Sequence, residues 1–486
     1  MTKLSSSYRE VLAGLTTSFA LVPESLAFAL VAHLNPLMGL YGAAIICGLT
    51  AVLGGRPGMI SGAAGSMAVV IIALVVSHGP QYLLATVVLG GLLMMLFGLL
   101  RLASLIRMVP HPVMLGFVNG LAIIIAMAQL DHFKIRDAGG LHWLQGSALL
   151  LMLGLTATTM LIVYLIPKFT RRLPPALIAI VGLAVVCSAF QLPTRQLGDL
   201  AHIAGNLPRL HWPQVPWDLA TLRIITPYAV LMAVVGLLET LLTLRVTQEI
   251  TATGSQPNRE CIALGAANIS SGLLGGMGGC AMIGQTMINL GSGGRGRLSG
   301  LVCGVMIMLY IVALSPLIEK IPLAALAGVM FVVAQQTFAW ASLRQLGRIP
   351  LSDAVVIIAV TAITVWTDLA IAVVCGVILS ALSFAWQQAG HLHARREEAA
   401  GHTDYHLGGL LFFASADGFL ALFELDRDAA VIRLDCQHLQ LVGQSATAAL
   451  ETLQQRCLER GKRLQLVGLD AGQRHLLRHH PELVGA

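Results

Sequence analysis

The stretch from Pro57 to Leu100 decides the fold class, and it reads PGMISGAAGSMAVVIIALVVSHGPQYLLATVVLGGLLMMLFGLL. It contains no Asp, Glu, Lys or Arg. A membrane-spanning helix needs roughly 20 predominantly apolar residues, so a charge-free run of this length accommodates two crossings. The sequence therefore predicts membrane-spanning segments at this point of the chain.

The composition of the whole chain agrees with this prediction. The 486 residues are 56% hydrophobic and only 11% charged, and the mean hydropathy is +0.79. An ordinary soluble domain carries about 25% charged residues. These values exclude a soluble enzyme, a nucleic-acid-binding protein (despite the net charge of +6) and a disordered scaffold. We expect a multi-pass protein of the cell inner (cytoplasmic) membrane, with the lipid bilayer as its surroundings.

Apolar runs between charges and Pro or Gly breaks divide residues 8–387 into about fourteen membrane segments. Their centres lie near residues 20, 45, 69, 91, 121, 155, 182, 233, 266, 285, 307, 329, 358 and 377. The segments near 69 and 285 are short and begin in glycine-rich stretches, so we expect partial helices there. The composition changes to His, Arg, Glu and Asp after about residue 388, which predicts a small soluble α/β domain over 388–486. Its expected strands are Leu410–Ala414, Ala430–Leu434 and Arg463–Val467, and its expected helices are Thr447–Arg460 and Gln473–Arg478.

Loop charges orient the chain, because cytoplasmic loops carry an excess of Lys and Arg. With the N-terminus inside, the cytoplasmic loops hold Lys3, Arg9, Arg56, Arg101, Arg107, Lys168, Arg171, Arg172, Arg245, Arg259, Arg295, Arg297, Arg344 and Arg348. The opposite loops then hold only Lys134, Arg136, Arg195, Arg209, Arg223 and Lys320. This bias predicts a cytoplasmic N-terminus, and an even number of spans predicts a cytoplasmic C-terminus as well.

Two matched spacings predict an inverted repeat. Glu24 lies inside the first segment, and Ser66, in the break Gly62–Ser66, follows 42 residues later. Glu239 lies inside the eighth segment, and Ala281, in the break Gly275–Ala281, also follows 42 residues later. About seven spans separate the two units, so they would enter the membrane from opposite sides, as in many secondary transporters. We expect one repeat over about 8–190 and the other over about 224–387, within a transport domain of residues 1–387.

The glycine breaks predict an anion site. Glycines clustered at the start of a shortened helix let an extended backbone turn into that helix, whose first N–H groups have no intrahelical partner. Such donors are costly inside a membrane unless something accepts their hydrogen bonds. Each helix N-terminus carries about half a positive charge, so two opposed N-termini would bind an anion.

Two membrane carboxyl groups need an explanation, because an acid costs about 2.5 to 3.5 kcal/mol at the centre of a spanning helix. Glu24 follows Pro23, which frees a backbone carbonyl. It is either a structural acid bonded to that irregular backbone or a proton-coupling carboxyl, and we favour coupling. For Glu239 we favour a structural role, because Arg245 or a polar helix could pair with it.

Six stretches of the transport domain carry a family resemblance: Val22–Ala29, Pro36–Tyr41, Gly54–Gly62, His111–Phe117, Asn258–Glu260 and Gly265–Asn268. These stretches resemble the SulP anion transporters, and the C-terminal domain is similar to a STAS domain. The resemblance implies fourteen spans in two inverted repeats of seven, a core domain and a gate domain, and a homodimer. It also implies an anion site between the third and tenth segments. Matched to this sequence, that site comprises Ala27, Phe28, Gly65, Ser66, Met67, Met282, Ile283, Gly284, Gln285 and Thr286.

Three positions depart from the family pattern. Many members place an arginine between a small residue and Ser or Thr at the tip of the tenth segment, where this chain has Gln285. Sodium-coupled bicarbonate members carry an aspartate near the end of the eighth segment, where this chain has Gln248, a poor ligand for a hard cation. The aspartate expected before the long STAS helix is also missing, which argues against a phosphorylation switch at Ser445.

These observations predict a secondary active anion transporter and no enzymatic activity, cofactor, metal or nucleic-acid partner. We favour proton-coupled symport of a small carboxylate or dicarboxylate such as fumarate, by elevator-type alternating access, with Glu24 as the coupling group and Glu239 next. An apolar cavity favours the neutral acid, and a protonated Glu24 does not repel an incoming anion. The alternatives are a bicarbonate or sulfate transporter, and an uncoupled anion channel or exchanger. A sensor that signals through its STAS domain and a nucleobase transporter of the same fold are further alternatives.

Overall fold

A computed structural model of the chain describes residues 3–104, 110–137, 140–169, 174–200, 205–345, 347–367, 369–399 and 401–480. The loop residues Arg107, Arg171 and Arg172, used above for orientation, lie outside these ranges. The chain divides into two compact units, Met1–Gly376 and Val377–Ala486, which are described separately.

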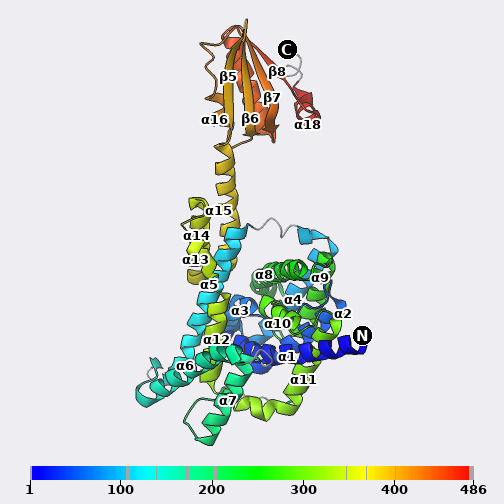
Figure 1. Cartoon of the computed structure of the whole chain (residues 1–486), viewed down its shortest axis with the longest axis vertical. Helices are drawn as coiled ribbons and strands as arrows, with labels where there is room; N and C mark the ends of the chain where they lie inside the picture. The colour runs from blue at the N-terminus through cyan, green and yellow to red at the C-terminus, as the bar shows by residue number, and fades with distance from the viewer. Residues whose placement is uncertain are drawn as a thin grey trace. The chain divides into compact units, whose positions relative to one another are not determined.

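Helices build the first unit (Figure 1). In chain order they are α1 (Lys3–Val31), α2 (Pro36–Leu53), α3 (Gly65–His78), α4 (Pro80–Leu99), α5 (His111–Gln129), α6 (Gly146–Phe169), α7 (Pro175–Ala189), α8 (Leu219–Thr251), α9 (Pro257–Leu273), α10 (Ile283–Gly291), α11 (Arg297–Glu319), α12 (Leu323–Thr337), α13 (Trp340–Gln345), α14 (Leu351–Trp366) and α15 (Leu369–Ala389), which crosses into the second unit. Within the described residues, every predicted membrane segment coincides with one of these helices, and only the short α13 is additional. The predicted helical membrane fold is confirmed.

A preceding short strand, together with length, marks the partial helices. Eight helical stretches in the described residues are long and apolar enough to cross a membrane. By contrast, α3 has 14 residues and α10 only 9, and each follows a short strand, β1 (Ser61–Ala63) or β4 (Gly279–Ala281). The predicted partial helices therefore form where the glycine breaks lie.

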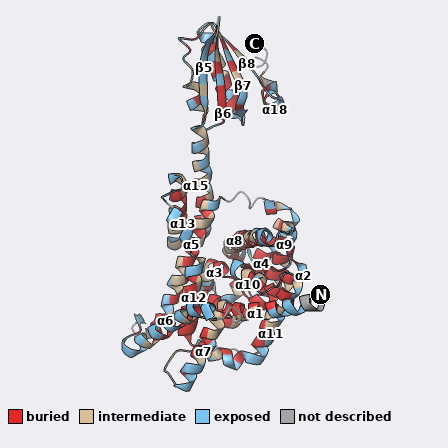
Figure 2. Cartoon of the chain, in the orientation of Figure 1, coloured by how far each residue is buried: buried red, intermediate tan, exposed pale blue. Residues whose placement is uncertain are grey.

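The helices form two packed groups. In the core group, α2 packs against α9 and α11, and α4 packs against α8 and α9. In the gate group, α5 packs against α12 and α14, and α6 packs against α7 and α12. Each group takes helices from both repeats, as the predicted inverted arrangement requires. Figure 2 shows many buried residues among α1–α4 and α8–α10, whereas many residues of α6 are exposed, as on a surface that faces lipid.

A four-stranded sheet forms the centre of the second unit, in the order β5 (His393–Ala399), β6 (His402–Leu411), β7 (Val431–Leu441) and β8 (Arg463–Val467). The pair β5–β6 is antiparallel and the other two pairs are parallel. Helices α16 (Ala416–Leu420), α17 (Gln444–Glu459) and α18 (Ala471–Leu476) complete the predicted α/β domain. The hydrophobic core includes Phe419 and Leu450, both fully buried.

Three strands of this domain differ from the prediction. Strand β7 extends to Leu441, beyond the predicted end at Leu434. The strand β5 was missed because its sequence, HARREEA, is charged on both faces of an edge strand. The strand expected at Leu410–Ala414 instead begins at His402 and ends at Leu411. Polar residues alternate with buried Thr403, Tyr405 and Leu407 there, so the apolar run marked only the end of the strand.

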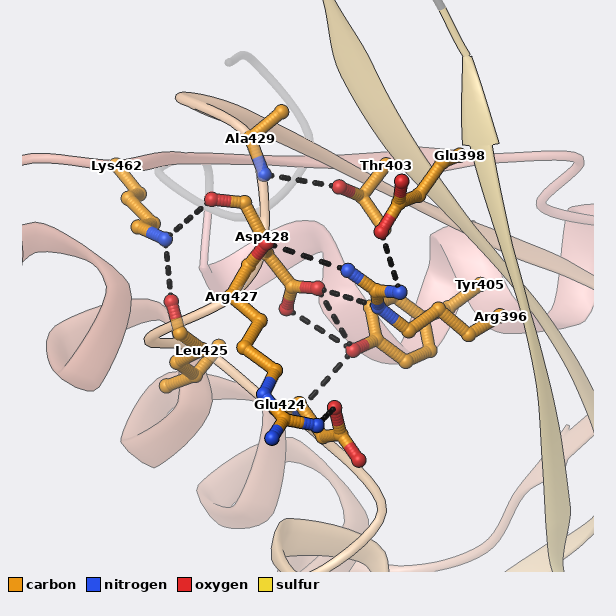
Figure 3. A network of polar contacts seen from close by, with 10 residues as sticks. All are labelled: Arg396, Glu398, Thr403, Tyr405, Glu424, Leu425, Arg427, Asp428, Ala429 and Lys462. Atoms are coloured by element: carbon orange, nitrogen blue, oxygen red, sulfur yellow. Dashed lines mark hydrogen bonds and ion pairs between the residues drawn. The ribbon is translucent and has the colours of Figure 1, made fainter.

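A buried carboxylate fixes the loop between α16 and β7 (Figure 3). Asp428 accepts hydrogen bonds from Arg396 Nε at 2.8 Å and from the Tyr405 hydroxyl at 2.9 Å, and the same hydroxyl accepts one from the Glu424 N–H. Burial, with the neighbouring Asp428 carboxylate, raises the pKa of Tyr405 above its usual value, so the phenol remains a donor at neutral pH.

Candidate functional site

Two short strands from opposite repeats pair inside the first unit. Strands β1 and β4 are antiparallel, and Ser61 lies opposite Ala281, Gly62 opposite Cys280, and Ala63 opposite Gly279. A Cβ atom at Gly279 would lie 2.0 Å from the Gly62 carbonyl oxygen, so only glycine allows this close approach. The pairing satisfies backbone groups that could not remain unpaired in a membrane. It also places the starts of α3 and α10 next to each other in the core.

The first backbone N–H groups of both half-helices have no hydrogen-bond partner among the described residues. Ala64 precedes α3 and Met282 precedes α10, and neither residue makes a side-chain capping hydrogen bond. The first intrahelical bonds run from Ala68 N to Ala64 O and from Thr286 N to Met282 O. The N–H groups of the first three helical residues, 65–67 in α3 and 283–285 in α10, are the donors that a helix leaves free for an anion.

Glu239, on α8, contacts the start of α3. Its Oε2 atom accepts hydrogen bonds from Ser66 Oγ at 2.7 Å and from Cys280 Sγ at 2.8 Å. The expected partner Arg245 makes no ion pair among the described residues. The Glu239 carboxyl of the second repeat thus receives its hydrogen bonds from the half-helix of the first repeat and from β4.

Glu24, on α1, contacts the start of α10. Its Oε2 atom accepts a hydrogen bond from Gln285 Nε2. Although Pro23 lies inside it, α1 runs as one helix from Lys3 to Val31, and the Ser25 hydroxyl donates to the Leu21 carbonyl at 2.7 Å. The carboxyl of the first repeat therefore faces the half-helix of the second.

The starts of α3 and α10 differ in access. A Cβ atom at Gly65 would lie 2.7 Å from Phe28 Cε1, so the Phe28 ring covers the start of α3. At Gly284 a Cβ atom would meet nothing within 4 Å, and Ile283 is 43% exposed. The start of α10 is therefore the more accessible of the two helix starts.

The remaining predicted site residues are enclosed by protein. Thr286 is buried, and its Oγ1 atom accepts a hydrogen bond from Ile60 N at 3.1 Å. Met67 is buried against Gly236, and Ala27 is also buried. Met282 donates its backbone N–H to the Ile60 carbonyl. In this conformation the hydroxyls of Ser66 and Thr286 thus already have protein partners, and the backbone donors are the groups left for a ligand.

Sequence reasoning missed the side chains that hold the strands. Asn268 is fully buried in α9 and exchanges two hydrogen bonds with the backbone of Gly279, at 2.9 and 3.0 Å. Thr240 Oγ1 accepts a hydrogen bond from Ala281 N at 3.0 Å. The only available signal was that polar side chains recur within apolar helices, which does not say what they bind.

A buried acid also fixes the loop before β1. Glu260 Oε2 accepts hydrogen bonds from Gly55 N at 2.6 Å and from Arg56 N at 3.1 Å. The Arg56 guanidinium in turn donates to the carbonyls of Thr253 and Gly254 at 2.6 Å each. The α2–β1 loop and the α8–α9 loop are therefore locked together, which again joins the two repeats within the core.

Other cavities and polar groups are less suited to bind an anion than the starts of α3 and α10. A cavity of about 490 Å³ lies between α1, α7 and α11 beside Pro23, but its walls are almost entirely apolar. Gln248 Oε1 accepts a hydrogen bond from Ser255 Oγ at 2.9 Å. No group of three or more His, Cys, Asp or Glu side chains that could hold a metal occurs in the described ranges.

Comparison with known proteins identifies the family. The model of the sulfate permease family matches residues 8–360, and that of the STAS domain matches residues 393–480. A putative sulfate transporter, YbaR of Bacillus subtilis, is 38% identical over 471 residues, which cover 97% of this chain and 96% of that protein.

Two solved structures are similar as well. The transmembrane domain of a cyanobacterial bicarbonate transporter, BicA, aligns with a TM-score of 0.66 and 30% identity, over 77% of this chain and 98% of that one. The murine anion transporter Slc26a9 aligns with a TM-score of 0.84 over 97% of this chain and 87% of that one, at 16% identity, which shows the shared fold alone. The paired half-helices, the two helix groups and the family match lead to one conclusion: the chain belongs to the sulfate permease (SulP) family of membrane anion transporters and carries a C-terminal STAS domain.

Proposed function

We propose that this protein is a proton-coupled symporter of a small carboxylate or dicarboxylate such as fumarate. The observation that carries the proposal is the hydrogen bond between Gln285 and Glu24 at the start of α10. The half-helix provides donors for an anion, and the protein's own carboxyl group lies beside them. A neutral amide stands where many family members have a fixed cation.

The charge balance of the site supports proton coupling. An ionised Glu24 would repel an anion that approaches the same helix start, because two like charges at short range disfavour each other. Protonation removes this repulsion, so the anion and the proton bind together. Release of both on the other side, and return of the empty carrier, would complete a symport cycle.

The two helix groups support an elevator mechanism. The polar groups of the site come from β1, β4, α1, α3, α8 and α10, none of which belongs to the gate group defined above. Movement of the core past the gate helices would carry the site across the membrane as one body. We further propose a homodimer in the inner membrane, with both termini and the STAS domain in the cytoplasm and the STAS domain serving regulation or assembly.

Bicarbonate or sulfate is the second candidate substrate, since the relatives with those names cover nearly the whole chain or its transmembrane domain. One experiment separates the candidates. Purified protein in liposomes is assayed for uptake of labelled fumarate, bicarbonate and sulfate, with imposed pH and sodium gradients. Accumulation of fumarate driven by an inward proton gradient supports the proposal. Accumulation of only sulfate or bicarbonate replaces the substrate, and flux without accumulation indicates a channel or exchanger.

A further inference from the structure

A second cavity, at the ends of α4 and α8, is lined by groups that donate hydrogen bonds. Its volume is about 340 Å³, and its polar lining comes from Arg101, Ser104, Arg245, Gln248 and Asn258. None of the described residues that line it is acidic. Glu249 lies in an adjoining cavity of about 570 Å³, which shares Arg245 and Gln248 with the first. The cavity is separate from the starts of α3 and α10.

The two arginines are not neutralised by the protein. Within the described part of the chain, neither Arg101 nor Arg245 makes an ion pair or a side-chain hydrogen bond. Both arginine side chains are exposed and line the same cavity, so an anion in it could bind to both at once. Guanidinium groups present several donors in a planar fork, which matches the oxygen atoms of a phosphate.

Two amide side chains, those of Asn258 and Gln248, also line the cavity. Asn258 Oδ1 accepts the backbone N–H of Ala103 at 3.3 Å, which fixes the orientation of the amide. Gln248 Oε1 accepts the hydroxyl of Ser255. Both carbonyl oxygens are therefore used, and both NH₂ groups remain without a partner among the described residues. The two guanidinium groups and the two amide NH₂ groups are thus all hydrogen-bond donors, which is what an oxyanion requires.

The backbone at Arg101 is a further sign of function. Its φ angle is +59°, in the left-handed region that favours glycine after a helix end. An arginine there costs conformational energy of about 1 kcal/mol, although its charge also complements the C-terminal dipole of α4.

From these contacts we propose that the cavity binds a phosphate-type oxyanion. The ligand is either the headgroup of an anionic phospholipid or free inorganic phosphate. The ends of α4 and α8 are the ends of membrane-spanning helices, where headgroups lie, and Leu241 and Met114 give the cavity apolar walls for the start of an acyl chain. Met114 belongs to α5 of the gate group, whereas Arg245 belongs to the core group. A bound ligand therefore contacts both the gate group and the core group, and it changes the free-energy difference between the arrangements that the two groups adopt.

The test measures the melting temperature of the full-length protein in nanodiscs of phosphatidylcholine, alone, with added phosphatidylglycerol, or with inorganic phosphate in the buffer. The variants are the double substitution Arg101→Gln/Arg245→Gln, its charge-preserving match Arg101→Lys/Arg245→Lys, and Arg223→Gln, which removes an exposed arginine near the other end of α8. We expect phosphatidylglycerol or phosphate to raise the Tm of the wild type and of Arg223→Gln by about 3 °C or more. The Gln pair should lose that rise, and the Lys pair should keep part of it.

The two ligand arms identify the source. A rise with phosphatidylglycerol alone identifies a lipid, and a rise with phosphate in the neutral nanodiscs identifies the free anion. The proposal is overturned if neither raises the Tm of the wild type, if the Gln pair keeps the full rise, or if Arg223→Gln loses it equally. Native mass spectrometry of retained lipid or phosphate decides the case in which the Gln pair melts too early for a Tm comparison. Neither measurement depends on transport, so the result is independent of the symport proposal.

Discussion

Ser66 and Glu239 belong to opposite repeats, and the Ser66 hydroxyl donates a 2.7 Å hydrogen bond to the Glu239 carboxylate. Glu24 and Gln285 form the reciprocal contact. Each membrane acid thus faces the half-helix of the other repeat. The two contacts are not equivalent: among the described residues, Glu239 has two side-chain donors, Ser66 and Cys280, whereas Glu24 has the single amide of Gln285. This inequality favours Glu24 as the acid that exchanges its proton.

The substitution Glu24→Gln is expected to preserve substrate binding and abolish accumulation driven by a proton gradient. The amide retains the size of the side chain and its contact with Gln285, but it cannot release a proton. Equilibrium binding of labelled substrate to purified protein and uptake into liposomes with an inward proton gradient measure the two effects. Continued pH-driven accumulation by the variant would show that Glu24 is structural, and Glu239→Gln would then be tested in the same assay.

The substitution Gln285→Arg is expected to make anion binding less dependent on pH and to weaken proton coupling. A guanidinium beside Glu24 would form a charge-assisted pair and hold the carboxyl in its ionised form. Substrate affinity is measured between pH 5 and 8 for wild type and variant, with Gln285→Met as a match of similar length without charge or donors. An unchanged pH dependence in Gln285→Arg would argue that Glu24 does not couple the proton to the anion.

Enlarging Gly284 is expected to weaken anion binding without harming the fold. A Cβ atom there would meet nothing within 4 Å, so we expect Gly284→Val to fold and to lower affinity at least about tenfold, or 1.4 kcal/mol. Gly65→Val differs because it collides with Phe28, and overpacking of this kind costs about 1–3 kcal/mol of stability. Calorimetric binding and thermal melting compare the two variants. Normal affinity in Gly284→Val would place the anion elsewhere.

Uptake is expected to continue when sodium is replaced by choline or potassium. Gln248 stands where sodium-coupled relatives were expected to carry an acid, and its carbonyl oxygen is already bonded to Ser255. The measurement is initial uptake in liposomes at constant ionic strength, with the pH gradient collapsed by an ionophore as the positive control for loss of drive. A strict requirement for sodium would contradict both the ion assignment and the proton-coupling proposal.

In the STAS domain, Tyr405→Phe is expected to loosen the loop that precedes β7. The change leaves the buried Asp428 carboxylate and the Glu424 N–H short of one partner each, a loss of about 1–3 kcal/mol. Hydrogen exchange of the full-length protein, followed by mass spectrometry, should show faster exchange over residues 424–429. Phe413→Leu, at an exposed site in the same domain, is the matched control, and equal exchange in both variants would refute the role of the network.

The sequence was sufficient for the membrane fold and for the half-helices, because apolar length and clustered glycines are local signals. The identical spacing from Glu24 to Ser66 and from Glu239 to Ala281 also revealed the repeat. The spacing did not reveal that each acid contacts the half-helix of the other repeat, since that contact depends on how two distant segments cross in space. The roles of Asn268 and Thr240 were hidden for the same reason: a polar side chain in an apolar helix does not name its partner. Strand β5 was missed because charged edge strands lack the apolar alternation by which strands are detected.

The pairing of β1 with β4 also constrains how the protein is made. Strand β1 is synthesised long before β4, and until its partner arrives its backbone N–H and C=O groups have no strand to bond with. The first repeat must therefore wait in the bilayer, or at the insertion machinery, in an incomplete state. It becomes a finished structure only when the second half of the chain has been inserted beside it. The two repeats, although similar in design, mature as one unit and not one after the other.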